Sequence, residues 1–303
     1  MDKCVFIHTN ERQWLGALVA QYSFRRNSAN ADKFDVRFIH TKDYDYLSAK
    51  EGQTFLRGGT TREWHMDDLQ SFTPLRFLPP KLMHHTGRAV LTDPDIFAVG
   101  DIYELLDRDM AGAAVMGRHR SAKEGKGHQV ATSVMLMDCA RLKHWDPEGD
   151  FEALFRFEKD YKEWMVLAYE DPDNVGYFED YWNDFDNLDA HTRLLHNTKR
   201  RTQPWKTGLP VDYTPADKFK DKPLLASANR LRAKVFGEYG LLGRYREHPD
   251  TNQEAFFFGL LKECLENGHV SEDLVREEIS KNHVRHDAFE VLDRTPPLER
   301  SAA

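Results

Sequence analysis

The sequence is poor in cysteine and has no long apolar run, and each absence excludes a class of protein. Its three cysteines, Cys4, Cys139 and Cys264, lie far apart. No two of them have the spacing of metal ligands, and the odd number argues against a disulfide framework. No apolar segment approaches the ~20 residues that a membrane span requires, and the basic-then-apolar plan of a signal peptide is missing. We therefore expect a cytoplasmic protein without a transmembrane segment, and peripheral attachment to a membrane surface stays open.

An excess of positive charge is also missing. The 303 residues include 42 Lys and Arg against 50 Asp and Glu, which gives a net charge of −8. Because a protein that binds duplex nucleic acid needs a basic surface, we expect no nucleic-acid partner. The chain is 40% hydrophobic and 12% aromatic, so it has enough apolar material to bury a substantial core.

Strand and helix patterns alternate in the first half of the chain. Residues 4–8 (CVFIH) form a short apolar run typical of a buried strand, and residues 34–40 (FDVRFIH) alternate like a second strand. Between them, from Trp14 to about Arg26, apolar residues recur at helical spacing. Further strands are predicted at 88–92, 111–116 and 130–137. This order predicts an α/β fold with a doubly wound sheet.

The second half is predicted to be mainly helical. Helices are expected within 151–169, at 226–242 and at 271–281, and residues 251–254 (TNQE) have the pattern of a capping box before another helix. Three polar segments are predicted to be loops, short helices or irregular structure: 43–64, 117–129 and 171–189.

Two carboxylates directly follow the strand predicted at 88–92. In extended backbone, Asp93 and Asp95 point to the same face, so both can approach one ion. Pro94 between them fixes φ, and open α/β sheets bind ligands at this end of a strand. Carboxylate oxygens suit Mg²⁺ or Mn²⁺, which in turn bind a diphosphate. The alternative is an ordinary turn, which the residue types by themselves favour.

A basic segment farther along the chain begins at His196 (HNTKRRTQPWK, 196–206). Cations concentrated in an otherwise acidic protein can neutralise a departing diphosphate. By itself, the pattern also fits a loop histidine followed by a solvated basic turn.

Four segments, in order along the chain, resemble glycosyltransferase family 8, which includes glycogenin and bacterial lipopolysaccharide galactosyl- and glucosyltransferases. Residues 75–109 (LRFLPPKLMHHTGRAVLTDPDIFAVGDIYELLDRD) resemble the core of that family, with GDIYELL behind the aspartate pair. Residues 6–24 resemble its first strand and helix. The other two segments are 134–145 (VMLMDCARLKHW) and 196–205 (HNTKRRTQPW).

The resemblance implies a GT-A fold, with a central mixed, mostly parallel sheet flanked by helices. Residues 1–215 would form the catalytic domain that binds the nucleotide-sugar and the metal, and 216–303 a mostly helical C-terminal extension packing on it. The implied cofactor is Mn²⁺ or Mg²⁺, and the implied donor is a nucleotide-diphosphate sugar, usually UDP-linked. In this resemblance the metal ligands are Asp93, Asp95 and His196, and the donor contacts are Arg76, Thr9 and Asn10.

Some positions depart from the family pattern. Residues 131–133 (ATS) replace an asparagine-containing motif, and Gln203 replaces a lysine. The missing charge is expected from Lys199, Arg201 or Lys206. The acidic motif that faces the sugar has no clean counterpart, and the catalytic candidates in its region are Glu170 and Asp173.

These features together predict a metal-dependent retaining glycosyltransferase. It would move a hexose from the donor to a hydroxyl of a carbohydrate, lipid or protein acceptor that the sequence does not identify. Two alternatives stay open. One is a non-catalytic scaffold on the same fold that binds a nucleotide-sugar, and the other is a sugar nucleotidyltransferase, which also uses paired carboxylates.

Overall fold

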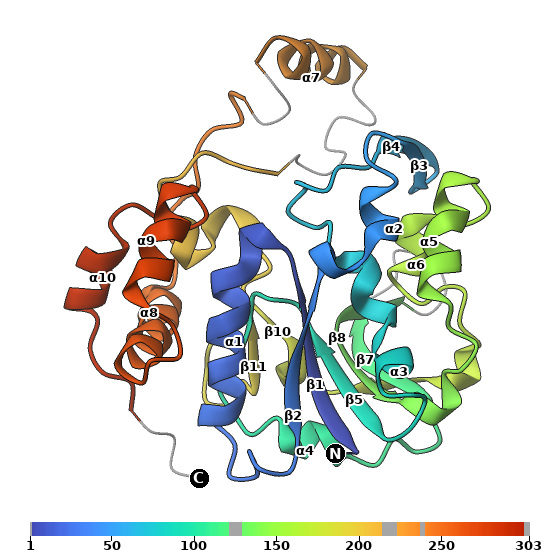
Figure 1. The fold of residues 1–303 in the computed structure, drawn as a ribbon, viewed down its shortest axis with the longest axis horizontal. Coiled ribbons are helices and arrows are strands. Elements are labelled where there is room, and N and C mark those ends of the chain that lie inside the picture. The colour runs from blue at the N-terminus through green and yellow to red at the C-terminus, as the bar shows by residue number, and fades with distance from the viewer. Residues whose placement is uncertain (1, 121–128, 214–222, 237–239, 300–303) are drawn as a thin grey trace.

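The computed structural model describes residues 2–120, 129–213, 223–236 and 240–299. A six-stranded sheet lies at the centre of the fold (Figure 1) and consists of β1 (Lys3–Thr9), β2 (Asp35–His40), β5 (Arg88–Thr92), β7 (Val115–Arg120), β8 (Gln129–Asp138) and β9 (Val175–Phe178). The strand order is β2-β1-β5-β8-β7-β9. Strand β1 is parallel to β2 and β5, β9 is parallel to β7, and β8 is antiparallel to both its neighbours. The predicted α/β fold with a mixed, mostly parallel sheet is confirmed.

The centre of the sheet is buried on both faces, which explains why the inner strand β1 is an almost continuous apolar run. In β1, Val5 and Ile7 belong to one hydrophobic core, whereas Cys4 and Phe6 belong to a second core on the opposite face. Successive side chains of a strand alternate between faces, so a single apolar run supplies both cores.

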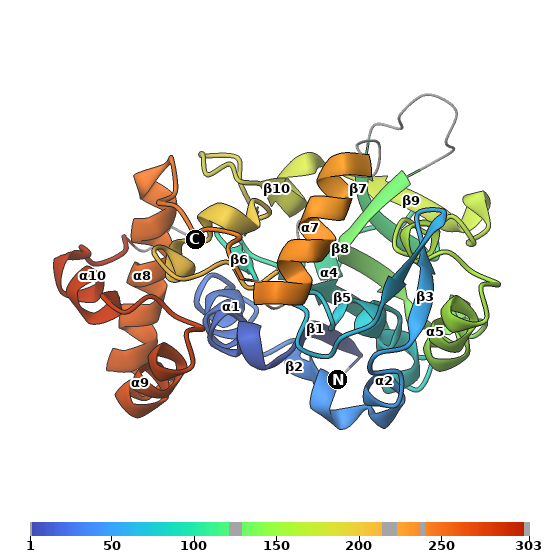
Figure 2. The ribbon, with the colours of Figure 1, turned by 90° about the horizontal axis from the view of Figure 1, so that it is seen from above.

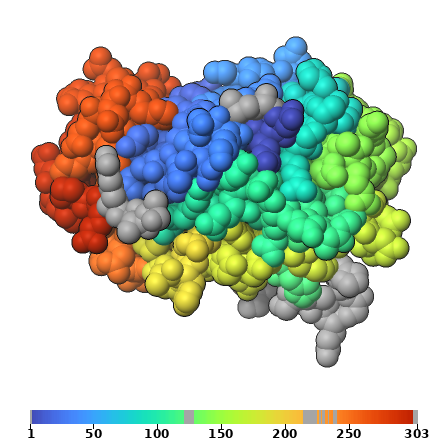
Figure 3. All heavy atoms as spheres, turned by 90° about the horizontal axis from the view of Figure 1, so that it is seen from below, coloured from blue at the N-terminus to red at the C-terminus, as the bar shows by residue number. Residues whose placement is uncertain are grey.

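Helices cover both faces. The first core contains side chains of α1 (Trp14–Arg26), α4 (Tyr103–Leu106), α8 (Thr251–Glu266), α9 (Glu272–Ser280) and α10 (Ala288–Arg294). The second core contains side chains of α2 (Asp45–Ser48), α3 (Pro79–Leu82), α5 (Pro147–Phe155) and α6 (Tyr161–Trp164). Figure 3 shows the C-terminal helices, orange to red, packed against the blue N-terminal segment. The division into two domains stays a prediction.

Two small sheets complete the described fold. Strands β6 (Ile96–Ala98), β10 (Asp184–Phe185) and β11 (Leu194–His196) form one, and β3 (Thr54–Arg57) pairs with β4 (Thr60–Glu63) in the other. The short 3₁₀ turns are Glu11–Gln13, Thr41–Asp43, Thr73–Phe77, Cys139–Arg141, Pro172–Asn174, Asp180–Asn183, Arg200–Thr202 and Pro204–Lys206. One helix, α7 (Pro223–Phe236), stands apart beyond the end of the sheet at which β1 ends (Figures 1 and 2).

The structure corrects four local predictions. The segment 43–64 is not only loop and short helix, because Gly58 and Gly59, with φ of 63° and 73°, form the two-residue turn of a hairpin. The strand predicted at 111–116 begins only at Val115, since Ala111 and Gly112 have positive φ and form a turn.

The predicted capping box of α8 is also wrong. The N-cap is Asp250, whose carboxylate accepts a hydrogen bond from the backbone N–H of Asn252 at 3.0 Å. Glu254 instead accepts a hydrogen bond from Arg285 at 2.6 Å. The predicted irregular loop 117–129 is strand at both ends, and its residues 121–128 lie outside the described part of the chain. None of the helices in the described ranges has the length and apolar character needed to cross a membrane.

Candidate metal and donor site

The aspartate pair lies between two strands, at the carboxyl end of β5 and just before β6. The backbone N–H of Asp93 donates to the carbonyl of Ser133 at 2.9 Å, which continues the β5–β8 ladder into the turn. Helix α1 packs closely against this turn, because a Cβ on Gly16 would lie 2.8 Å from the carbonyl oxygen of Pro94. Glycine therefore allows the helix to approach the backbone of the pair.

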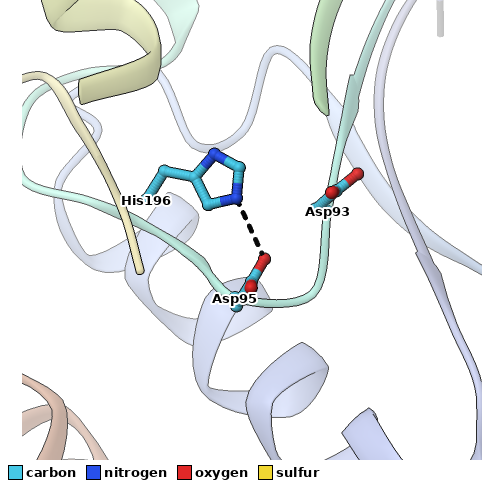
Figure 4. Close-up of side chains that lie close together, drawn as sticks. All are labelled: Asp93, Asp95 and His196. Atoms are coloured by element: carbon cyan, nitrogen blue, oxygen red, sulfur yellow. Dashed lines mark ion pairs between the residues drawn. The ribbon is translucent and has the colours of Figure 1, made fainter. Parts of the chain in front are cut away.

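His196 reaches the pair through strand pairing. Strand β11 runs antiparallel to β6, with His196 opposite Ile96, so the imidazole comes to lie beside Asp95 (Figure 4). The backbone N–H of Asn197 donates to the carbonyl of Asp95 at 3.1 Å. One ligand atom from each of Asp93, Asp95 and His196 lies within 4.8 Å of the others. The structure therefore brings together the three predicted metal ligands.

The hydrogen bonds around His196 fix which of its nitrogens faces the carboxylates. Its Nδ1 lies 2.8 Å from the amide oxygen of Asn183, and the amide nitrogen of Asn183 donates to Ser133 Oγ at 2.9 Å. Because an amide oxygen only accepts, Nδ1 carries a proton, and Nε2 presents a lone pair in the neutral form of the ring. A partner of this kind is typical of metal-binding histidines.

Asp95 presents a carboxylate oxygen toward this nitrogen. Its Oδ2 accepts a hydrogen bond from Gln203 Nε2 at 2.9 Å. Its Oδ1 is buried, accepts no hydrogen bond from any described residue, and lies 3.4 Å from His196 Nε2. Two lone pairs thus face each other in a buried place, which is unfavourable unless a proton or a cation lies between them. Oxygen and imidazole nitrogen are suitable ligands for Mn²⁺ or Mg²⁺, so the residues present fit a divalent ion.

Asp93 is held from the opposite side. Arg76 Nη2 donates to both of its oxygens, at 2.8 and 2.6 Å, and His8 Nε2 lies 2.6 Å from Oδ1. Burial opposes the ionisation of Asp93, but Arg76 and His8 hold its pKa well below the usual range. The other nitrogen of His8 lies 3.0 Å from the carbonyl of Phe72. Both partners of His8 are acceptors, but burial lowers the pKa of His8, so the neutral ring donates to one of them and only the imidazolium form would donate to both.

A cavity of about 920 Å³ opens over these residues. Its wall includes Arg76, Asp93, Asp95 and His196 together with polar residues from distant parts of the chain. The basic residues on the wall are Arg57, Arg76, Arg120, Lys162 and Arg200, and the acidic ones are Asp93, Asp95, Glu163 and Glu170.

Several predicted site residues lie elsewhere. Thr9 and Asn10 are buried but do not line the cavity, and the Asn10 amide donates to Ser71 Oγ at 3.0 Å. Lys199 and Arg201 are exposed outside the cavity wall, and Lys206 is fully buried beside Asp212, at 2.7 Å. Their predicted roles toward the donor therefore gain no support from their positions.

The two candidate catalytic carboxylates differ in position. Asp173 is exposed and does not line the cavity. Glu170 does line it, but both of its oxygens accept hydrogen bonds, from Trp145 at 2.7 Å, Asn174 at 2.9 Å and His144 at 2.8 Å. Burial opposes its ionisation, and these hydrogen bonds lower its pKa. Glu170 is thus a carboxylate stabilised by its neighbours.

Sequence reasoning missed three residues of the site, His8, Asn183 and Thr132, and it included Arg200 only as a member of the basic segment 196–206. The Thr132 hydroxyl accepts from Arg76 Nη1 at 2.9 Å and donates to the carbonyl of Met165 at 2.7 Å. Arg200 lines the cavity, whereas its neighbours in the basic run do not. The nearest signal for Thr132 and Asn183 was their place in segments that differ from the family pattern.

Comparisons with known proteins find similarity in structure and none in sequence. No protein-family profile and no curated protein sequence matches the chain. The galactosyltransferase LgtC, solved with donor and acceptor sugar analogues, has 12% identity over 74% of this chain and 95% of its own, with a TM-score of 0.47. The apo form of the glycosyltransferase GlyE from Streptococcus pneumoniae TIGR4 has 15% identity over 67% of this chain and 55% of its own, with a TM-score of 0.46. The apo form of mouse xyloside xylosyltransferase 1 has 13% identity over 66% of this chain and 99% of its own, with a TM-score of 0.43. These three neighbours are glycosyltransferases. At such identities the alignments transfer no residue roles to this chain.

Proposed function

We propose that this chain is a metal-dependent glycosyltransferase. Its donor would be a UDP-hexose, and it would transfer the hexose to an acceptor hydroxyl with retention of the anomeric configuration. The observation that carries the proposal is the unpaired Oδ1 of Asp95, which faces His196 Nε2 at 3.4 Å on the wall of the cavity. A buried pair of lone pairs beside a second carboxylate supports a cation site, and its place at the carboxyl end of β5 supports a ligand there.

In this proposal Asp93, Asp95 and His196 hold Mn²⁺ or Mg²⁺, which when bound supplies Lewis-acid stabilisation to the departing diphosphate. Asn183 fixes the imidazole of His196, and Gln203 fixes the carboxylate of Asp95. Each ligand is thus oriented by a neighbour, as metal sites generally require.

Arg76 would have two tasks. Its Nη2 keeps Asp93 ionised, and its buried Nε donates to no described residue, so one N–H of this cavity-lining side chain is left for the donor. We assign support of the diphosphate charge to Arg200 ahead of the predicted Lys199, Arg201 and Lys206, because Arg200 is the member of that basic run on the cavity wall.

We assign no enzyme nucleophile. The carboxylates on the described cavity wall besides the metal ligands are Glu163 and Glu170, and both accept hydrogen bonds, Glu163 from Tyr169 at 2.9 Å. Attack of the acceptor hydroxyl from the face that the diphosphate leaves would give retention without a covalent intermediate. Glu170 and Asp173 stay predictions for an acid that faces the sugar.

One observation favours the non-catalytic binder as a second candidate. Asp93 is fully paired by Arg76 and His8 without any ion, as a purely structural carboxylate would be. Release of UDP from a UDP-hexose distinguishes the two functions, and release of pyrophosphate would indicate a nucleotidyltransferase instead.

The test uses Asp95→Asn, since Asp95 has fewer partners than Asp93 and the variant leaves no buried arginine unpaired. We expect UDP release in Mn²⁺ from a panel of UDP-hexoses to fall ~100-fold or more, about 2.7 kcal/mol of transition-state stabilisation. Mn²⁺ affinity, measured by calorimetry, should fall in parallel. Asp273→Asn, at an exposed acid of α9 outside the cavity wall, serves as the matched control. Undiminished Mn²⁺-dependent turnover in Asp95→Asn would refute the proposed metal site.

A further inference from the structure

Exposed apolar side chains gather on one segment of the molecule. Among the described residues, seven large hydrophobic side chains are exposed, and five of them lie in α7 or just after it: Leu225, Leu231, Val235, Phe236 and Leu241. Four of these five are more than half exposed, Leu231 at 64%, Val235 at 62%, Phe236 at 57% and Leu241 at 72%. Such a concentration marks an interaction surface, whereas single exposed apolar residues do not.

The same segment is basic in an acidic protein. Residues 223–246 contain five basic residues, Arg230, Arg232, Lys234, Arg244 and Arg246, and one acidic residue, Glu238, although the whole chain carries a net charge of −8. Lys234, Arg244 and Arg246 are exposed. The partner of this surface must therefore accept apolar side chains and offer negative charge.

Four exposed apolar side chains share one broad side of the helix. Leu231 and Val235 are one turn apart, and Leu225 and Phe236 are three turns apart. Lys234 lies on the other side by the same spacing, whereas Arg232 falls within the apolar side and donates to the carbonyl of Gly240. Figures 1 and 2 show α7 standing clear of the sheet and of the helices that cover it, beyond the end of the sheet where β1 ends.

We propose that the apolar side of α7, together with Leu241, docks on the surface of a bilayer that contains anionic phospholipid. Helices with this combination lie in the membrane interface, with apolar side chains between the lipids and basic side chains among the headgroups. A second copy of the chain is the poorer occupant, because a symmetric contact would bring the basic residues of two α7 helices together.

The docking segment leads directly into the candidate site. Arg201 Nη2 donates to the carbonyl of Leu242 at 3.0 Å, and the backbone N–H of Tyr245 donates to the carbonyl of Leu209 at 2.9 Å. These contacts tie the segment after α7 to the loop that carries Gln203. Docking would therefore hold the cavity end of the protein near the lipid surface. This inference does not rest on the proposed activity.

The experiment is co-sedimentation of the full chain with vesicles of phosphatidylcholine alone and of phosphatidylcholine mixed with phosphatidylserine, at low and high salt. We expect binding to the mixed vesicles that weakens as salt rises. The double substitution Leu231→Ser and Phe236→Ser should lower the partition coefficient about tenfold or more, because two apolar side chains no longer insert. Phe157→Ser, at a 52% exposed phenylalanine away from α7, should leave it unchanged.

Several outcomes would overturn the proposal. One is equal binding of the wild-type chain and the double variant to the mixed vesicles, and another is a loss in Phe157→Ser as large as in the double variant. A third is a concentration-dependent dimer that the double variant abolishes, without vesicle binding. Because UDP release is measured separately without vesicles, failure of the docking proposal and failure of the proposed function are distinguishable.

Discussion

Two buried clusters of charged and polar side chains lie at the two ends of the segment 196–206. We call a cluster balanced when each of its carboxylate oxygens has a hydrogen-bond donor or cation beside it within the protein, and the two clusters differ in this respect. At one end, Asp95 Oδ1 and His196 Nε2 face each other without a proton donor between them. At the other end, Lys206 pairs with Asp212 at 2.7 Å, and the Tyr245 hydroxyl donates to the second oxygen of the same carboxylate.

The comparison teaches that buried charge alone does not mark a functional site. Lys206 is fully buried, and burial lowers its pKa, yet its charge is balanced within the protein. Burial opposes the ionisation of Asp212, but Lys206 and Tyr245 lower its pKa. This cluster is complete and holds the loop in place. In the cluster at Asp95, Oδ1 accepts no hydrogen bond from any described residue, and in the proposed function a bound cation would complete this cluster.

The largest expected effect breaks the balanced cluster. Lys206→Met would leave Asp212 buried beside fewer donors, and we expect the free energy of unfolding to fall by about 3–5 kcal/mol, measured by urea denaturation. Mn²⁺ affinity of the folded protein should change little. Lys199→Met, at an exposed position in the same loop, is the control. If the folded fraction of Lys206→Met turned over much more slowly than folded wild-type protein, that result would restore the predicted role of Lys206 toward the diphosphate.

A smaller effect concerns the unbalanced cluster. Asn183→Leu removes the acceptor that holds the Nδ1–H of His196, so the ring no longer presents Nε2 to the ion in a fixed orientation. We expect Mn²⁺ affinity to fall about tenfold, or about 1.4 kcal/mol. Asn183→Asp keeps an acceptor at this position and should retain most of the affinity. Equal calorimetric affinity in the leucine variant and the wild type would contradict the assignment.

The smallest effect concerns Glu170. Like the carboxylate of Asp212, both of its oxygens accept hydrogen bonds within the protein. Because its folded-state pKa is lowered, its ionised form adds stability above the unfolded pKa of about 4.3, and this contribution is lost as pH falls below that value. Glu170→Gln should therefore cost about 1 kcal/mol near neutral pH and progressively less toward pH 3. Turnover should persist; a collapse of ~100-fold or more would instead make Glu170 the catalytic acid.

The sequence predicted the local parts of this fold better than the long-range ones. The strand at Arg88–Thr92 and the helix at Trp14–Arg26 were predicted at their observed bounds, because buried apolar residues follow the period of each element. The edge strand Val175–Phe178 was missed, since it contains Gly176 and has only one buried side chain.

The candidate site shows the same limit. The spacing of Asp93 and Asp95 was enough to predict that they share a face. The spacing could not place His196, which reaches them only through the register of β11 on β6, and it was the family resemblance that identified this residue. His8 and Asn183 stayed hidden because their roles depend on contacts with residues far away in the chain.

The contacts that support the loop also fix when the site is completed during synthesis. Gln253 accepts a hydrogen bond from the Asn197 amide at 2.8 Å, and the backbone N–H of Arg285 donates to the carbonyl of Trp205 at 2.7 Å. Chains grow from the N-terminus, so the aspartate pair leaves the ribosome long before either support. Until Gln253 emerges, the segment that carries His196 lacks both anchors, and until Arg285 emerges it lacks the second. The candidate site is thus complete only after residue 285 has been translated, and release of a chain that ends before it would yield a sheet without a finished centre.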